Sequence, residues 1–222
     1  MGKNAYKGKY FSVLGDSVST LAGYHPPECG VFYDWKMKRL AGISVPEDTW
    51  WGRVIADLEG KLLVNHSWAG STVCRLPGCE VQSYGCSHER TGALGTEGRL
   101  PDVVMIFMGL NDLGFGMSLA PDGDSLTAFP VAYSVMLKNI QRHYPGAEIW
   151  CLTLPQIPGI GERARKFNQV IRYCADENGC RCVDIYRTDA VCDTMGDYHP
   201  TVQGMQSIAR LVMEEIKTGG SH

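Results

Sequence analysis

The sequence lacks several features that would each define a class of protein. None of its 222 residues lie in an apolar segment long enough to cross a bilayer, so we expect no membrane span. Neither sign of charge dominates, because 21 basic residues stand against 24 acidic ones, for a formal net charge of −3. This balance gives no general attraction to phosphate backbones, and we expect no nucleic-acid partner. No repeat or low-complexity tract divides the chain, and its length suits a single domain over residues 1–222.

The two ends of the chain carry little information about the fold. Residues 1–6 lack the apolar core of a secretory signal, which favours a cytoplasmic protein. Secretion is the alternative if a leader had been removed. Residues 219–222 (Gly-Gly-Ser-His) resemble an appended tail and take no part in the predicted fold.

Cysteine is abundant, but its pattern lacks the pairing typical of metal sites and disulfide frameworks. The nine cysteines are odd in number and irregular in spacing, and no Cys-x-x-Cys pair is present. Thiolates and imidazole suit zinc, so Cys74, Cys79, Cys86 and His88 form the one conceivable metal set. Without a close pair we expect no metal and interpret the cysteines as small buried side chains. One disulfide within segment 74–86 is the alternative for an exported protein.

Strand and helix patterns alternate along the chain. Short apolar runs predict five strands, at residues 10–14, 62–64, 102–108, 148–152 and 182–185. Amphipathic stretches predict helices between and after them, beginning at Asp48, covering 133–144 and 164–174, and beginning again near Pro200. The run at 102–108 is almost continuously apolar, as expected for a strand buried on both faces. The sequence therefore predicts an α/β protein with a five-stranded parallel sheet between two helical layers.

Four short motifs follow predicted strands or lie in the last connection. They are Gly15-Asp16-Ser17, Gly70, Gly109-Leu110-Asn111-Asp112 and Asp197-Tyr198-His199-Pro200. In an open α/β sheet, ligands bind outside the carboxyl ends of the strands, where the loops meet. A serine, two oxyanion donors and a histidine at that edge are the parts of an acyl-transfer site.

Each motif taken alone has a plainer interpretation. Gly15 can turn the chain while Ser17 caps a helix, and Asn111 can belong to a simple turn. Serine is a weak nucleophile without an adjacent base, and His199, in a polar loop, is the histidine best placed to be that base. The Gly-x-Ser-x-Gly elbow of typical α/β-hydrolases is absent.

An oxyanion hole completes the predicted site. We expect its donors to be the backbone N–H groups of Ser17 and Gly70 and the side-chain amide of Asn111. Such donors stabilise the negative charge that a tetrahedral intermediate places on the former carbonyl oxygen. The predicted chemistry needs neither a metal nor an organic cofactor.

In the order and separation of these motifs, the chain resembles the SGNH hydrolase superfamily, also called GDSL esterases and lipases. The resemblance implies a flavodoxin-like, three-layer α/β/α sandwich and hydrolysis of esters through an acyl-enzyme. Segments 48–52 (DTWWG) and 86–91 (CSHERT) are similar to a bacterial branch of that superfamily. The resemblance assigns four roles: nucleophile Ser17, oxyanion donors Gly70 and Asn111, and base His199.

One position departs from the superfamily pattern. An acid usually stands three residues before the histidine, where this chain has Gly196. We expect a local shift of the loop to let Asp197 orient His199 and stabilise its charged form. The alternatives are a serine–histidine dyad oriented by a backbone carbonyl and a weaker acid, Asp193.

Analogy with the superfamily also gives an expected substrate, which is a short-chain acyl ester such as an acetyl ester, of a small molecule or a carbohydrate. A lipase or lysophospholipase is the second interpretation, although no apolar lid segment favours it. A carbohydrate-binding protein that has lost turnover is the non-enzymatic alternative, and the displaced acid is the feature in its favour.

Overall fold

Five parallel strands form the central sheet of the protein, in the order β2-β1-β3-β4-β5. The structure is a computed structural model and describes residues 3–76, 78, 84–120, 125–186 and 191–218. The strands are Tyr10–Gly15 (β1), Lys61–Ser67 (β2), Val103–Phe107 (β3), Glu148–Leu152 (β4) and Arg181–Val183 (β5). The predicted α/β class with a five-stranded parallel sheet is therefore confirmed.

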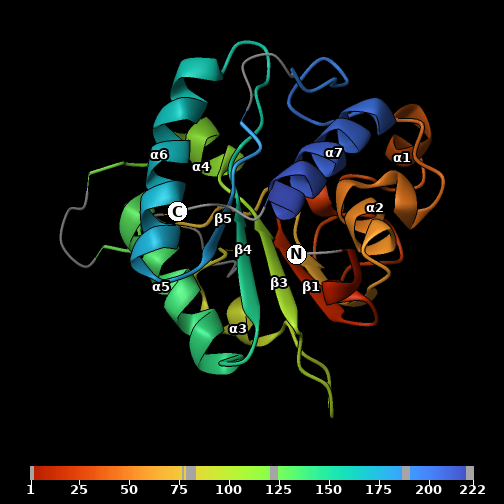
Figure 1. The fold of residues 1–222 in the computed structure, drawn as a ribbon. Coiled ribbons are helices and arrows are strands. Elements are labelled where there is room, and N and C mark those ends of the chain that lie inside the picture. The colour runs from red at the N-terminus through yellow and green to blue at the C-terminus, as the bar shows by residue number, and fades with distance from the viewer. Residues whose placement is uncertain (1–2, 77, 79–83, 121–124, 187–190, 219–222) are drawn as a thin grey trace.

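Helices cover both faces of this sheet (Figure 1). On one face α5 packs against α3 and α6, and α4 also contacts α6. On the other face α2 packs against α7, with α1 beyond them. The helices are Met37–Leu40 (α1), Trp50–Asp57 (α2), His88–Gly92 (α3), Leu110–Phe115 (α4), Phe129–His143 (α5), Gly161–Glu177 (α6) and Val202–Thr218 (α7).

The core lies on both sides of β3, the middle strand. All five of its residues are buried, because helices press on each face and the strand has a neighbour on each edge. This placement explains why its sequence is apolar without the alternation of a half-exposed strand. The predicted inward stripe of α5 is also buried, including Met136, Leu137 and Ile140.

Side-chain capping fixes the starts of two helices, of which the cap predicted at Asp48 was wrong and the start predicted near Pro200 lies within two residues of the observed one. The hydroxyl of Thr49 accepts from the backbone N–H of Gly52, so α2 is capped at Thr49 and not at Asp48. The Asp48 carboxylate instead accepts from the backbone of Ser44 and Val45. Similarly, the hydroxyl of Thr201 accepts from the N–H of Gly204, so α7 begins at Val202, two residues after Pro200.

The second strand is longer than its apolar residues suggest. It continues to Ser67 because Asn65, His66 and Ser67 pair with the last three residues of β1. Polar side chains therefore occupy the carboxyl end of β2. Residues 219–222, predicted as a tail, lie outside the described residues.

The eight cysteines of the described residues are free thiols. Cys74 and Cys86 are both unbridged, so no disulfide closes segment 74–86. Burial raises the pKa of Cys86 to about 12, in keeping with a small apolar core residue. Cys79 lies outside the described residues, among which no cluster of three or more metal-ligating side chains is found.

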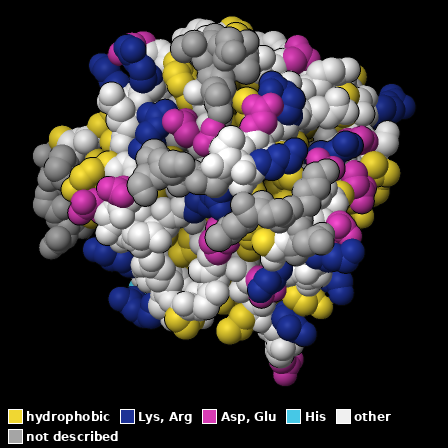
Figure 2. Space-filling view, viewed as in Figure 1, with side chains coloured by type: hydrophobic (Ala, Val, Ile, Leu, Met, Phe, Trp, Pro, Cys, Tyr) yellow, Lys and Arg dark blue, Asp and Glu magenta, His cyan; other side chains and the backbone are white. Residues whose placement is uncertain are grey.

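Charged side chains of both signs are interspersed over the face seen in Figure 2. Across the described part of the chain, none of the helices combines the length and the apolar character needed to cross a membrane.

Candidate active site

Strand register brings three of the predicted motifs to one edge of the sheet. Gly15 at the end of β1 lies beside Ser67 of β2 and Phe107 of β3. Ser17, Gly70 and Asn111 follow these three residues by only two, three and four positions. The loops that carry them therefore start side by side at the carboxyl edge, where α/β proteins bind ligands.

The turn after β1 presents Ser17 at the start of a short 3-10 helix, Ser17–Ser19. Asp16 caps this helix, since its Oδ1 accepts from the backbone N–H of Val18 at 3.0 Å. The turn is tight, because a Cβ on Gly15 would lie 2.5 Å from the Cβ of Ser19. Asp16 thus takes the capping role, and the hydroxyl of Ser17 makes a different contact.

That contact is part of one hydrogen-bonded line through Ser17, His199 and Asp197. The Nε2 atom of His199 lies 3.0 Å from Ser17 Oγ, and its Nδ1 lies 2.7 Å from Asp197 Oδ2. Asp197 Oδ1 also accepts the backbone N–H of His199 at 2.6 Å. With the ring proton on Nδ1, the imidazole donates to Asp197 and accepts from Ser17. Asp193 lies elsewhere, where it accepts from the hydroxyl of Thr201.

Burial and the ion pair act in opposite directions on these two ionisable groups. Burial lowers the pKa of His199, and its hydrogen bond to Asp197 and the charge of that carboxylate offset only part of this effect. Burial raises the pKa of Asp197, but hydrogen bonds from His199 outweigh it and leave the value below the ordinary one. At neutral pH the site therefore holds a neutral imidazole and an ionised carboxylate.

Asn111 and Asp112, in the first turn of α4, hold the loop that contains Gly70. The side-chain amide of Asn111 donates to the carbonyl of Ser71 at 2.8 Å, which leaves its second N–H for another acceptor. The buried carboxylate of Asp112 accepts from the backbone N–H groups of Val73 and Cys74, at 2.8 and 2.9 Å. Gly70 itself is exposed and has a φ of 79°, a conformation that favours glycine.

Arg90, in α3, is a buried part of the site that the sequence analysis did not predict. Its side chain is 1% exposed, and its guanidinium donates to the carbonyls of Gly15 and His66 at 3.0 and 2.6 Å. It also donates to the hydroxyl of Ser71. Burial lowers the pKa of Arg90 to about 10, so the group stays charged at neutral pH. One cation therefore joins the ends of β1 and β2 to the loop of Gly70.

The segment 86–91 was the sequence feature that pointed to the region of Arg90. Its structural role, however, could not be inferred from sequence. An arginine in a polar segment is usually exposed, and nothing local shows that it turns inward. Ser87 caps α3 by accepting from the backbone N–H of Arg90, which fixes the direction in which the helix starts.

We expect Arg90→Met to lower the free energy of unfolding by about 3 kcal/mol or more. Methionine keeps much of the side chain's apolar stem, but the carbonyls of Gly15 and His66 lose a charged donor, and unsatisfied buried groups cost about 1–3 kcal/mol each. Urea unfolding measures the loss. Arg53→Met is the control, because Arg53 pairs with Asp57 at 3.2 Å on the surface, where ion pairs contribute little. Equal losses in the two variants would contradict the structural role of Arg90.

The fold and the site together define a class of enzyme. A parallel α/β sheet whose carboxyl edge carries a hydroxyl, an imidazole and a carboxylate in line is the arrangement of serine hydrolases. The sequence model of the family described as GDSL-like Lipase/Acylhydrolase matches residues 9–216. The chain belongs to this family, which places it among the carboxylic-ester hydrolases.

Of two similar proteins, one shares the fold over nearly the whole chain and the other shares sequence over about half of it. The structure of a GDSL-like lipase from Bacteroides ovatus is 27% identical with a TM-score of 0.77, and the match covers 96% of this chain and 99% of that one. The cellulase/esterase CelE of Acetivibrio thermocellus is 30% identical over 122 residues, which are 53% of this chain and 14% of that enzyme.

A carbohydrate esterase of family two from Clostridium thermocellum, solved in complex with cellohexaose, shares the fold. It has a TM-score of 0.63 at 17% identity, and the match covers 96% of this chain and 65% of that one.

Proposed function

We propose that the protein hydrolyses short-chain acyl esters, above all acetyl esters of carbohydrates, through an acyl-enzyme. In this proposal Ser17 is the nucleophile, His199 the base and Asp197 the acid that orients it. The observation that carries the proposal is the line of contacts at 3.0 and 2.7 Å through the imidazole. The displaced acid, which favoured a binding protein without turnover, still reaches Nδ1 of His199 and so gives that alternative no support.

The reaction has two halves that use the same groups. Ser17 Oγ attacks the ester carbonyl while Nε2 of His199 takes the hydroxyl proton. The backbone N–H groups of Ser17 and Gly70 and the amide of Asn111 stabilise the oxyanion, and each such donor contributes about 3–4 kcal/mol. His199 then protonates the departing alcohol. Water repeats the sequence on the acyl-enzyme, releasing the acid and restoring Ser17.

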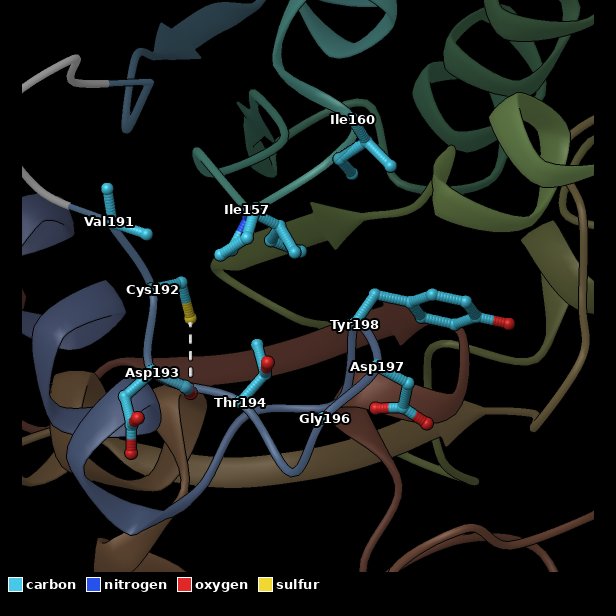
Figure 3. Close-up of a pocket in the computed structure, with 10 residues that line it drawn as sticks. Ile157, Ile160, Val191, Cys192, Asp193, Thr194, Gly196, Asp197 and Tyr198 are labelled. Atoms are coloured by element: carbon cyan, nitrogen blue, oxygen red, sulfur yellow. Dashed lines mark hydrogen bonds between the residues drawn. The ribbon is translucent and has the colours of Figure 1, made fainter.

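A cavity lined in part by Asp197 and Tyr198, the two residues before His199, supports a ring-sized alcohol. It measures about 550 Å³, within the usual size of ligand pockets. Figure 3 shows Ile157 and Ile160 on one side of it and the segment that carries Val191, Asp197 and Tyr198 on the other. Asp197 and Tyr198 directly precede His199, which delivers a proton to the leaving alcohol. We therefore assign the alcohol half of the ester to this cavity, where the 38% exposed Tyr198 offers a face for a sugar.

The known proteins favour the same substrate class. CelE is named a cellulase/esterase, and the family-two enzyme was solved with a bound oligosaccharide. The first shares sequence with about half of this chain and the second shares its fold. These likenesses support a carbohydrate ester and leave the acyl length to experiment.

Rates on matched esters test the proposal. We expect nitrophenyl acetate to react at least about tenfold faster than nitrophenyl octanoate, as a short acyl site requires. Tyr198→Ala should raise KM for an acetylated xylooligosaccharide and leave KM for methyl acetate unchanged, because the methanol half of methyl acetate is too small to fill the cavity. Faster octanoate hydrolysis would favour the lipase or lysophospholipase alternative. An unchanged KM for the sugar ester would remove the cavity from the proposal.

The pH dependence follows from the state of the base. Only neutral imidazole can accept the proton of Ser17, and burial first of all holds the pKa of His199 below its ordinary 6.5. We expect kcat/KM for nitrophenyl acetate to rise with pH and to reach half its plateau below pH 6.5. A profile from about pH 4 to 8 measures it. A midpoint above 6.5 would show that the pairing with Asp197 outweighs burial.

A further inference from the structure

The ring of Phe32 lies flat against the imidazole of His199. The two ring centroids are 3.4 Å apart and the planes differ by 5°. Both imidazole nitrogens are engaged, by Asp197 and by Ser17, so Phe32 covers a face of the ring that no hydrogen bond can hold. His199 is only 7% exposed as a result of this packing and its neighbours.

The backbone around Phe32 is attached to both the nucleophile and the base. The N–H of Phe32 donates to the hydroxyl oxygen of Thr20 at 3.0 Å, and that hydroxyl donates to the carbonyl of Ser17 at 2.8 Å. The hydroxyl of the next residue, Tyr33, donates to the carbonyl of Pro200 at 2.7 Å. Residues 32–33 therefore connect the turn of Ser17 to the loop of His199. These hydrogen bonds hold the Phe32 ring in place against the imidazole.

We propose that Phe32 is a positioning residue that keeps the imidazole in line with Ser17 and stabilises the imidazolium formed during acylation. The inference rests on the proposed function, in which His199 is the base. As Ser17 Oγ bonds to the carbonyl carbon, its proton moves to Nε2 and the ring gains a positive charge. The face of a benzene ring is electron-rich and attracts a cation within about 6 Å, most strongly where water is excluded. Phe32 thus favours the charged ring over the neutral one.

The effect of Phe32 on the pKa of His199 must be separated from the effects of other ionisable groups near the imidazole. Among the described residues, Asp197 is the carboxylate that is hydrogen-bonded to the imidazole. It is unchanged in every Phe32 variant described below. Burial raises the pKa of Tyr33 well above its ordinary value and that of Cys192 to about 12, so both are neutral. Asp16, next to Ser17, accepts from the N–H of Val18, and burial raises its pKa to about 7. The ring of Tyr198 also lies against the imidazole, with the two ring centroids 4.8 Å apart. All of these groups are present in every Phe32 variant described below.

Direct titration of His199 tests the proposal without a substrate. The pKa of the ring is read by NMR, with the His199 signal identified by its loss in His199→Gln. Phe32→Leu keeps apolar bulk but removes the aromatic face, and we expect the pKa to fall by about 0.5 to 1 unit. Phe32→Tyr keeps the face and should stay near the native value. We also expect kcat/KM for nitrophenyl acetate to fall about three- to tenfold in Phe32→Leu and to be kept in Phe32→Tyr.

A matched control and two contrary outcomes define the test. Tyr24→Leu removes an aromatic ring from the same connection, but Tyr24 is 43% exposed and packs near Trp51, so the pKa of His199 should not move. An unshifted pKa in Phe32→Leu, with thermal unfolding near native, would overturn the proposal. An equal shift in Phe32→Tyr would also overturn it, because bulk and not the aromatic face would then be responsible. If native protein lacked Ser17-dependent hydrolysis, the proposed function would fail whatever the titration gave.

Discussion

Replacing Ser17 with alanine is expected to lower kcat for nitrophenyl acetate on the order of a millionfold. The substitution removes the oxygen that attacks the carbonyl, and no other hydroxyl is bonded to Nε2 of His199 among the described residues. Binding of the ester should persist, because the oxyanion donors and the cavity are untouched. Release of nitrophenol measures turnover. Reaction with a fluorophosphonate followed by mass spectrometry reports the nucleophile directly.

Ser12→Ala is the control for this substitution. Ser12 is a buried serine on the same strand as the turn of Ser17, and its hydroxyl donates to the carbonyl of Leu94 at 2.7 Å. We expect this variant to keep both turnover and labelling. If Ser17→Ala were still labelled at the native rate, the nucleophile would have to be sought elsewhere.

Replacing Asp197 with asparagine is expected to lower kcat by about 10³- to 10⁴-fold. Asparagine can still accept the backbone N–H of His199, so the loop should keep its shape. Its amide cannot compensate the charge of the imidazolium, and an N–H facing Nδ1 would favour the wrong tautomer. The side chain of Asp197 is 48% exposed, so water takes over part of its role and holds the loss toward the lower figure. Single-turnover acylation by nitrophenyl acetate measures the effect.

Asp193→Asn separates the competing assignments of the acid. Asp193 accepts from Thr201, and the two imidazole nitrogens are hydrogen-bonded to Asp197 and Ser17, so the Asp193 variant should acylate at a near-native rate. A near-native rate for Asp197→Asn would instead support the serine–histidine dyad oriented by a backbone carbonyl. Loss in Asp193→Asn alone would reassign the acid to Asp193.

Regular alternation and short motifs carried much of the prediction of the fold. The strand at 103–107 was recognisable because burial on both faces leaves a continuous apolar run, which few other structures require. The end of β2 was missed because Asn65, His66 and Ser67 are polar, although backbone pairing with β1 extends the strand through them. Pairing partners far away in the sequence leave no trace in local composition.

The site was predictable where a residue follows a strand end and hidden where it comes from elsewhere in the fold. Ser17 and Asn111 could be placed from sequence, because the carboxyl ends of parallel strands share an edge. Arg90 and Phe32 could not, because each reaches the site from a connection whose path depends on tertiary contacts. The contact between Asp197 and His199 needed the loop geometry around Gly196, where φ is 94°.

Ser17 and His199 stand 182 positions apart in the chain, and their contact has a consequence for folding experiments. A nascent polypeptide carries the hydroxyl of Ser17 and the loop of Gly70 long before it carries the imidazole of His199. Pairings of such wide sequence separation form late and slowly, because the intervening chain must first be ordered. Recovery of ester hydrolysis after dilution from denaturant would therefore report when the loop before α7 packs against the turn of Ser17. Partly folded intermediates that lack this contact would show no hydrolysis.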